Sequence, residues 1–253
     1  MPEAIILGSG TSNGVPMLGV TYPPAYLANP KNHRNRACLV LLGPEGNLLV
    51  DCPPELRLMC TGAGITRFES VLITHTHADH IMGMDDLRSI CMLTNRAVPV
   101  YTLPIYQEDI RRVFNYAFKE FPPEVVVPRF DLRDVPETFS VGGMQIRTFL
   151  VRHGKDPVVA LRVGGFAYIT DVSEIPPEVM PLLGGLDTFV VDAVREKPHP
   201  NHFHMARALE VAKEIGAKKT YFTHLSADYD HDVTNAALPK GIELAYDGLR
   251  VPI

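Results

Sequence analysis

The sequence predicts an α/β (α+β) protein whose 253 residues form a single domain, 1–253. Short apolar runs with the composition of strands recur along the whole chain. The 22 Pro and 19 Gly residues interrupt these runs often, which is typical of many turns and few long helices. Only two stretches have a clear helical period. We therefore expect many strands and a few helices around one core.

In the first half of the chain, apolar runs alternate with Gly- and Pro-rich segments. A Gly-rich loop at 8–16 follows the first run, and Gly43-Pro44-Glu45-Gly46 separates two runs that we expect to pair as a hairpin. The run SVLIT has the length and composition of a buried strand. The elements predicted here are strands at 4–7, 37–42, 47–50, 70–74 and 98–102, and a helix at 105–120 that Pro122 and Pro123 end.

The second half of the chain repeats this pattern. Residues 204–215 have the apolar spacing of an amphipathic helix, and Gly216 is suited to its C-cap. No linker, low-complexity stretch or internal repeat divides the chain. The strands predicted here are 144–151, 160–163, 166–170, 188–191 and 220–223.

Composition excludes several classes of protein. Hydrophobic residues make up 46% and charged residues 21%, as in a folded globular domain. The net charge of −5 gives no global positive field, so we expect no long nucleic acid as partner. There is no 18-residue apolar run and no apolar stretch of signal-peptide length near residue 1, so we expect no membrane association. Four Cys without a C-x-x-C pair favour a reduced, cytoplasmic protein.

The ten His residues require an explanation, because imidazole is the commonest metal ligand. The segment Thr74-His75-Thr76-His77-Ala78-Asp79-His80 directly follows the SVLIT strand. Alternation along an extended segment places His75 and His77 on one side, and a turn can bring Asp79 and His80 to a second position. Such a cluster at a strand end can hold one or two divalent ions.

Three further candidate ligands also follow predicted strands. They are His153, Asp171 and His224. Each has an ordinary alternative: His153 as a loop residue, Asp171 as the N-cap of a helix at 173–179, and His224 as a turn residue. Their shared position at strand ends predicts that they converge on one edge of the sheets.

These residues resemble the metal-binding pattern of the metallo-β-lactamase superfamily. The resemblance implies a four-layer αββα sandwich with a dinuclear site at its edge, holding two divalent metal ions, Zn or Mn. It also implies that Asp51, which follows the strand at 47–50, supports the His cluster; an Asx turn before Pro53 is the alternative. The implied ligand sets are His75, His77 and His153 for one ion and Asp79, His80 and His224 for the other, with Asp171 bridging them.

Further motifs resemble the PhnP-like branch of this superfamily, whose members include phosphoribosyl cyclic-phosphate phosphodiesterases. These motifs are LGSGTSNGVP at 7–16, Arg34-x-Arg36, Asn201-His202, THLS at 223–226, ALP at 237–239 and YDG at 246–248. The sequence lacks the C-x-C-x-x-C cluster and the late His that bind a structural zinc in that branch. We therefore expect no structural zinc, and a Pro-rich loop at 20–30 ordered by packing through Tyr22 and Tyr26.

The resemblance predicts a metal-dependent phosphodiesterase acting on a small phosphodiester, such as a phosphoribosyl 1,2-cyclic phosphate or a 2′,3′-cyclic nucleotide. Two ions about 3.5–4 Å apart can lower the pKa of a bridging water to near 7, and the resulting hydroxide attacks phosphorus. Asp79 would be catalytic as well as a ligand, because it orients this hydroxide. His202 is the candidate substrate-binding and catalytic residue that protonates the leaving group, with helix capping as its alternative.

The remaining basic residues have weaker assignments. His33, His199, His204 and His231 are interpreted as surface or capping residues, with His231 the foremost exception. Arg34 and Arg36 are suited either to a substrate phosphate or to structural ion pairs.

Two alternative functions stay open. One is a tRNA 3′-processing endonuclease-like hydrolase, which shares the ligand set; however, residues 104–128 look like a compact helix rather than a flexible tRNA-binding arm. The other is a non-catalytic small-molecule binding protein like those of the PQQ pathway, which often lack part of the ligand set. The complete set of seven ligands favours an enzyme, and a homodimer is compatible with this interpretation.

Overall fold

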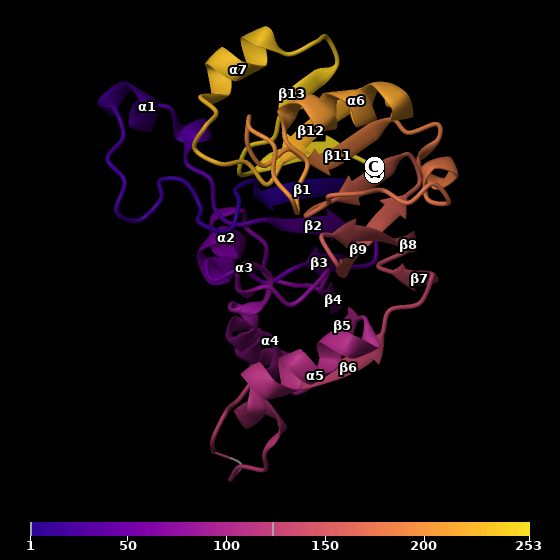
Figure 1. Ribbon diagram of the computed structural model, residues 1–253. Coiled ribbons are helices and arrows are strands. Elements are labelled where there is room, and N and C mark those ends of the chain that lie inside the picture. Colours follow the sequence, from indigo (N-terminus) through magenta and orange to yellow (C-terminus); the bar gives the residue numbers. More distant parts are fainter. Residues whose placement is uncertain (1, 123) are drawn as a thin grey trace.

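The computed structural model describes residues 2–122 and 124–253. Two mixed β-sheets pack face to face, and helices cover their outer faces (Figure 1). This arrangement confirms the predicted αββα sandwich. The first sheet has the order β14-β1-β2-β3-β4-β5-β6 and the second the order β13-β12-β11-β10-β9-β8-β7. The C-terminal strand β14 thus pairs with the N-terminal strand β1.

Most of the strands are short, as the Gly and Pro content predicts. The first sheet contains β1 (Glu3–Gly8), β2 (Cys38–Leu42), β3 (Asn47–Val50), β4 (Ser70–Leu72), β5 (Val98–Thr102), β6 (Phe130–Asp134) and β14 (Leu249–Pro252). The second contains β7 (Thr138–Val141), β8 (Met144–His153), β9 (Asp156–Val163), β10 (Phe166–Ile169), β11 (Thr188–Asp192), β12 (Lys219–Thr223) and β13 (Ile242–Leu244).

The helices are also short. The α-helices are α1 (Pro24–Ala28), α2 (Leu56–Gly62), α3 (Ala78–Ile81), α4 (Arg88–Thr94), α5 (Pro104–Val113), α6 (Met205–Ile215) and α7 (His231–Ala237). Short 3-10 helices are η1 (Pro30–Asn32), η2 (Met84–Leu87), η3 (Asn115–Phe118) and η4 (Met180–Leu183).

Alternation along the strands divides the core into three layers, because successive strand residues face opposite sides. In β1, Ile6 packs between the two sheets, whereas Ile5 packs under the helices that cover the first sheet. In β11, Val190 faces the intersheet layer and Val191 faces the layer under α6. Both faces of each sheet are therefore apolar, which explains why many strands read as continuous hydrophobic runs.

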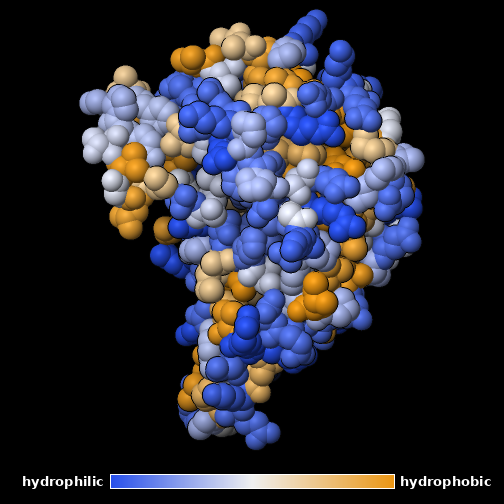
Figure 2. All heavy atoms as spheres, in the orientation of Figure 1, coloured by the Kyte–Doolittle hydropathy of each residue, from blue (hydrophilic) through white to orange (hydrophobic). Residues whose placement is uncertain are grey.

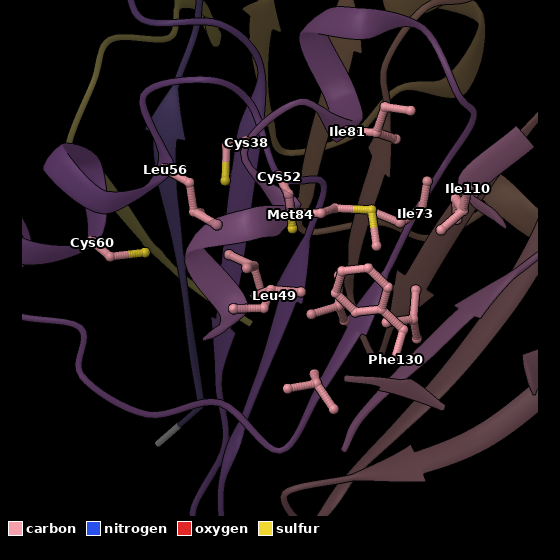
Figure 3. Packing of buried hydrophobic residues seen from close by; sticks show 14 of the residues in the cluster. Cys38, Leu49, Cys52, Leu56, Cys60, Ile73, Ile81, Met84, Ile110 and Phe130 are labelled. Carbon is pink, nitrogen blue, oxygen red and sulfur yellow. The ribbon is translucent and has the colours of Figure 1, made fainter. Parts of the chain in front are cut away.

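The layer under α2, α3 and α4 contains all four cysteines. Cys38, Cys52 and Cys60 lie among Leu, Ile and Met side chains (Figure 3), and Cys91 packs in the same cluster. All four are buried and free. Burial raises the pKa of the Cys38 and Cys52 thiols well above its ordinary value. These cysteines therefore act as small core residues.

The structure confirms one predicted element and shortens another. The predicted hairpin is formed by β2 and β3, with Gly43 donating to the Gly46 carbonyl across its turn. The helix predicted at 105–120 ends earlier, at Val113, because Phe114 leaves the helical conformation (φ −106°, ψ 41°) and buries its ring against Phe130. Pro122 therefore does not end α5, and Pro123 lies outside the described residues.

Residues 16–29, which we call the arm, project from the body beside α2 (Figure 1). Tyr22 and Tyr26 stack with ring centroids 5.3 Å apart, and the Tyr22 hydroxyl accepts from Met17 N. Exposed apolar residues of the arm include Leu18, which is 99% exposed, and the lower end of the arm is orange in Figure 2.

Among the described residues, every helix is too short or too polar to cross a membrane.

Candidate metal centre

The segment after β4 places its histidines by a change from strand to helix. The chain stays extended through His77, whose φ and ψ are −63° and 152°, and α3 then begins at Ala78. His75 is therefore buried, and His77 lies exposed at the N-cap of α3. Asp79 and His80 lie in the first turn of α3, on its buried side. This arrangement gives the two positions that the sequence predicts.

The first group of candidate ligands contains three histidines. His75 and His77 have ring centroids 4.5 Å apart, and His153, the last residue of β8, lies 5.5 Å from His75 and 5.0 Å from His77. One nitrogen from each ring lies within 4.8 Å of the others. The structure thus brings together residues from both sheets.

The second group contains Asp79, His80, Asp171 and His224, all buried. His80 Nε2 lies 3.3 Å from Asp79 Oδ2 and 3.3 Å from Asp171 Oδ2. His224 Nε2 lies 3.3 Å from Asp171 Oδ1 and 3.7 Å from Asp79 Oδ2. Asp171 Oδ1 also lies 3.9 Å from His75 Nε2 in the first group. Asp171 therefore lies between the two groups, as a bridging ligand would.

The chemistry of these groups fits divalent ions. Ligand atoms about 2.0–2.1 Å from a tetrahedral ion are about 3.3 Å apart, which matches the His80 and His224 spacings. The Nε2 atoms of His75, His80 and His224 are buried and have no hydrogen-bond partner among the described residues. A buried imidazole nitrogen without a partner is costly unless it binds an ion. The residues present therefore fit a metal site with nitrogen and oxygen ligands.

Electrostatics of the bare side chains also favour cations. Burial alone would raise the pKa of the Asp171 carboxyl, but the neighbouring His224 and His80 hold it well below its ordinary value. Burial would likewise raise the pKa of the Asp79 carboxyl, but the neighbouring His80 outweighs this effect and holds that pKa low. Burial would lower the pKa of His224, but Asp171 outweighs it and raises that pKa to about 9. Two buried carboxylates are thus ionised and require positive charge beside them.

The backbone at this site adopts a conformation that ordinary residues rarely take. Asp51, Asp171 and His224 all have positive φ, at 65°, 50° and 58°. Each comes just after a strand, following β3, β10 and β12 respectively. Such left-handed residues cost of order 1–3 kcal/mol each and cluster at functional sites. The left-handed turn aims each side chain back toward the shared edge.

Hydrogen bonds behind the rings fix their orientation. Asp51 is fully buried, and its Oδ2 lies 2.7 Å from His80 Nδ1 while its Oδ1 accepts from Thr74 N at 2.8 Å. The Asn201 carbonyl lies 2.7 Å from His153 Nδ1. Each ring therefore carries its hydrogen on Nδ1 and leaves Nε2 free for a ligand bond. This places Asp51 in the supporting role that the resemblance implies, rather than in an Asx turn alone.

His202 lies beside the two groups, two residues before the N-cap of α6. Its ring stacks on His224 at 4.9 Å and 15°, and lies 4.4 Å from His153. Its Nδ1 is 2.7 Å from Oδ2 of the fully buried Asp192, so it bonds to this carboxylate rather than to α6. Sequence reasoning missed Asp192. The available signal was its place at the end of β11, because the candidate ligands His153, Asp171 and His224 also follow predicted strands.

The other histidines and arginines take different places. His199, interpreted as a surface residue, lies with its ring 4.8 Å from His202. His231 is buried and bonds to Asn235. Arg34 is buried and donates to the Ser226 and Tyr229 carbonyls, so its role is structural. The remaining predicted residues are His204, at the N-cap of α6, His33, exposed and bonded to the Leu27 carbonyl, and Arg36, paired with Glu55.

Comparison with known proteins decides the family. The model of the beta-lactamase superfamily domain matches residues 46–225, which include the His cluster, Asp171 and His224. The chain belongs to the metallo-β-lactamase superfamily. A solved structure described as a new diphosphatase from the PhnP family is 34% identical, with a TM-score of 0.92, and the match covers 100% of this chain and 98% of that one. The predicted resemblance to the PhnP-like branch is therefore confirmed.

Two curated relatives extend this comparison. An octanoyltransferase of Porphyromonas gingivalis is 31% identical over 257 residues; the match covers 99% of this chain but only about half, 51%, of that protein. A ribonuclease Z of Myxococcus xanthus is 24% identical, and the match covers 94% of this chain and 98% of that protein. These comparisons therefore confirm the superfamily and the fold that the sequence predicted.

Proposed function

We propose that the protein is a dinuclear metal-dependent phosphodiesterase that hydrolyses a small phosphate diester. The observation that carries the proposal is the joint placement of two ligand groups around Asp171, with His202 beside them. We assign His75, His77 and His153 to one ion and Asp79, His80 and His224 to the other, with Asp171 shared. When bound, the two ions, Zn or Mn, would activate a water and neutralise charge on the phosphoryl oxygens.

The side chains of the chain itself supply the rest of the chemistry. His202 is proposed to protonate the departing alkoxide through Nε2, since its Nδ1 is engaged by Asp192. Asp192 holds the ring in place, because its buried carboxylate lies 2.7 Å from His202 Nδ1. Asp79 is suited to orient the attacking water, because its Oδ2 lies within 3.7 Å of both His80 and His224 nitrogens.

A small substrate is favoured over a long nucleic acid. The net charge is −5, and an RNA-binding hydrolase needs a basic surface that contacts many phosphates. Residues 104–118 form α5 and η3, whereas residues 119–122 and 124–129 contain no helix or strand, so the net charge is the main reason to favour a small substrate. A diphosphate is the second candidate, because the PhnP-family neighbour at 34% identity is described as a diphosphatase. A phosphodiester and a diphosphate both present a phosphorus atom with an oxygen leaving group, so the same residues could act on either.

The test is turnover by protein loaded with Mn²⁺ or with Zn²⁺. The substrates are bis-p-nitrophenyl phosphate, 2′,3′-cyclic AMP, ADP-ribose and a precursor tRNA, with chelated protein as the control. We expect turnover of the small diesters and none of the tRNA. Turnover of ADP-ribose alone would favour the diphosphatase. Cleavage of the tRNA alone, or activity only on lactones or thioesters, would contradict the proposal, and metal binding with no turnover of any substrate would favour a binding protein.

A further inference from the structure

The loop between β11 and α6, residues 193–204, carries a second imidazole that the proposed reaction has not used. His199 is half-buried, and its ring meets that of His202 edge to face at 4.8 Å. His153 lies on His202 as well, at 4.4 Å. His202 therefore contacts His153, which belongs to the proposed metal centre, and also His199, which lies outside both ligand groups.

The backbone of Asn201 fixes the hydrogen position on two of these rings. Its carbonyl accepts from His153 Nδ1 at 2.7 Å, which frees His153 Nε2 for an ion. Its N–H donates to His199 Nδ1 at 3.1 Å. An imidazole whose Nδ1 accepts a hydrogen bond carries its hydrogen on Nε2. His199 is thus held as a neutral ring whose free polar group is an Nε2–H donor.

The loop around His199 is also rigid. The Arg195 guanidinium donates to the Lys197 carbonyl at 3.0 Å and to the Pro198 carbonyl at 2.5 Å. Pro198 and Pro200 flank His199 and restrict its backbone. A donor fixed in this way loses little entropy when it binds, which is the property of a substrate-positioning group.

We propose that His199 is a substrate-binding residue that donates a hydrogen bond from Nε2 to an oxygen of the leaving group. This inference rests on the proposed function, because it takes His202 as the group that meets the scissile leaving oxygen. His199 lies one ring farther from the ligand groups than His202, so its Nε2–H donor would reach the next oxygen of the leaving group. His199 accordingly favours alcohols that carry a further hydroxyl, such as a sugar, over leaving groups without one.

Three variants at position 199 test this inference with two substrates. In 2′,3′-cyclic AMP the leaving oxygen stays on a ribose that also carries a ring oxygen and a free 5′-hydroxyl, whereas the nitrophenolate of bis-p-nitrophenyl phosphate has no hydroxyl. We expect His199→Ala to lower kcat/KM about tenfold for 2′,3′-cyclic AMP, mainly through KM, as for loss of one hydrogen bond. The loss for bis-p-nitrophenyl phosphate should stay below about twofold.

Conservative variants separate a donor from a structural role. His199→Gln places an amide donor near the position of Nε2 and should restore most of kcat/KM, whereas His199→Asn places it near Nδ1 and should not. His33→Ala is the matched control, because His33 is exposed and its ring bonds to the Leu27 carbonyl. Equal losses for both substrates, or no advantage of Gln over Asn, would overturn the inference.

A binding measurement separates this inference from the proposed function. Calorimetric titration of metal-loaded protein with 3′-AMP, a product of cyclic AMP hydrolysis, needs no turnover. We expect the Kd to rise about tenfold in His199→Ala and to return in His199→Gln. Protein that binds 3′-AMP in this pattern but hydrolyses no diester keeps the inference and loses the proposed function. Unchanged affinity in His199→Ala, or no binding to the unmutated protein, rejects the inference.

Discussion

The sharpest test of the proposed metal centre is a substitution that leaves every proposed ligand residue unchanged. Asp51→Asn keeps the shape of a side chain that is fully buried and accepts from Thr74 N at 2.8 Å. Asn tolerates the left-handed backbone at this position, where φ is 65°, so the change does not add strain. It removes the negative charge that lies 2.7 Å from His80 Nδ1. The variant therefore removes both the charge and the acceptor that hold the hydrogen of one proposed ligand on Nδ1.

The size of the effect follows from that contact. A carboxylate behind a ligating imidazole raises the basicity of the ring, and its loss weakens metal affinity about 10- to 100-fold. This corresponds to about 1.4–2.7 kcal/mol of binding free energy. The loss should fall on the ion assigned to Asp79, His80 and His224, and spare the ion assigned to the group with His75.

The assay is a competition titration of Zn²⁺ or Mn²⁺ against a chromophoric chelator, with circular dichroism to verify the fold. Asp247→Asn is the matched control: Asp247 accepts from Ser9 N, Ser9 Oγ and Asn35 N, and none of these donors is an imidazole. We expect this control to change stability without changing metal affinity. Unchanged affinity in Asp51→Asn, or an equal loss in Asp247→Asn, would refute the reasoning.

Three further predictions concern other parts of the molecule. His202→Ala should keep its metal content, measured by elemental analysis, while turnover of 2′,3′-cyclic AMP falls about 10²- to 10⁴-fold; full activity would remove His202 from the reaction. Asp171→Ala should lower metal occupancy, and two fully retained ions would contradict a bridging role. Burial, with the positive charges of Lys31 and Arg34, lowers the pKa of His231 from 6.5 to about 4. Between these values the unfolded chain binds a proton that the folded protein does not, so the free energy of unfolding should fall by roughly 2–3 kcal/mol as the pH drops from 6.5 to 4. Urea titrations across this range should show a smaller fall in His231→Gln; equal falls would exclude His231 as the cause.

Much of this site is predictable from the sequence, because its signals are local. Three His and one Asp within six residues after an apolar run leave few other interpretations. His153, Asp171 and His224 are each ambiguous alone, but they share a position relative to the strands. Strand ends that meet at one edge of a sandwich bring such residues together, and the structure places all three there.

The remaining features depend on contacts that are distant in the sequence. Asp192 ends a strand without any neighbouring motif, and only its 2.7 Å contact with His202 reveals it. His199 lies in a Pro-rich loop that reads as surface, and its role depends on the fold of the Asn201 backbone. Phe114 ends α5 because its ring enters the core beside Phe130, a packing effect that overrides helical periodicity.

The proposed centre takes side chains from both sheets, and this has a consequence for how the protein folds. Asp79 and His80 lie in α3, which follows β4 of the first sheet, whereas Asp171 and His224 follow β10 and β12 of the second sheet. An ion held by all four closes a loop of the chain more than 140 residues long, counted from residue 79 to residue 224. Neither half of the chain carries all four side chains, so tight metal binding should follow the packing of the two sheets against each other. The bound ion would then stabilise the folded protein more than the transition state of folding. Removing it with a chelator should therefore speed unfolding more than it slows refolding.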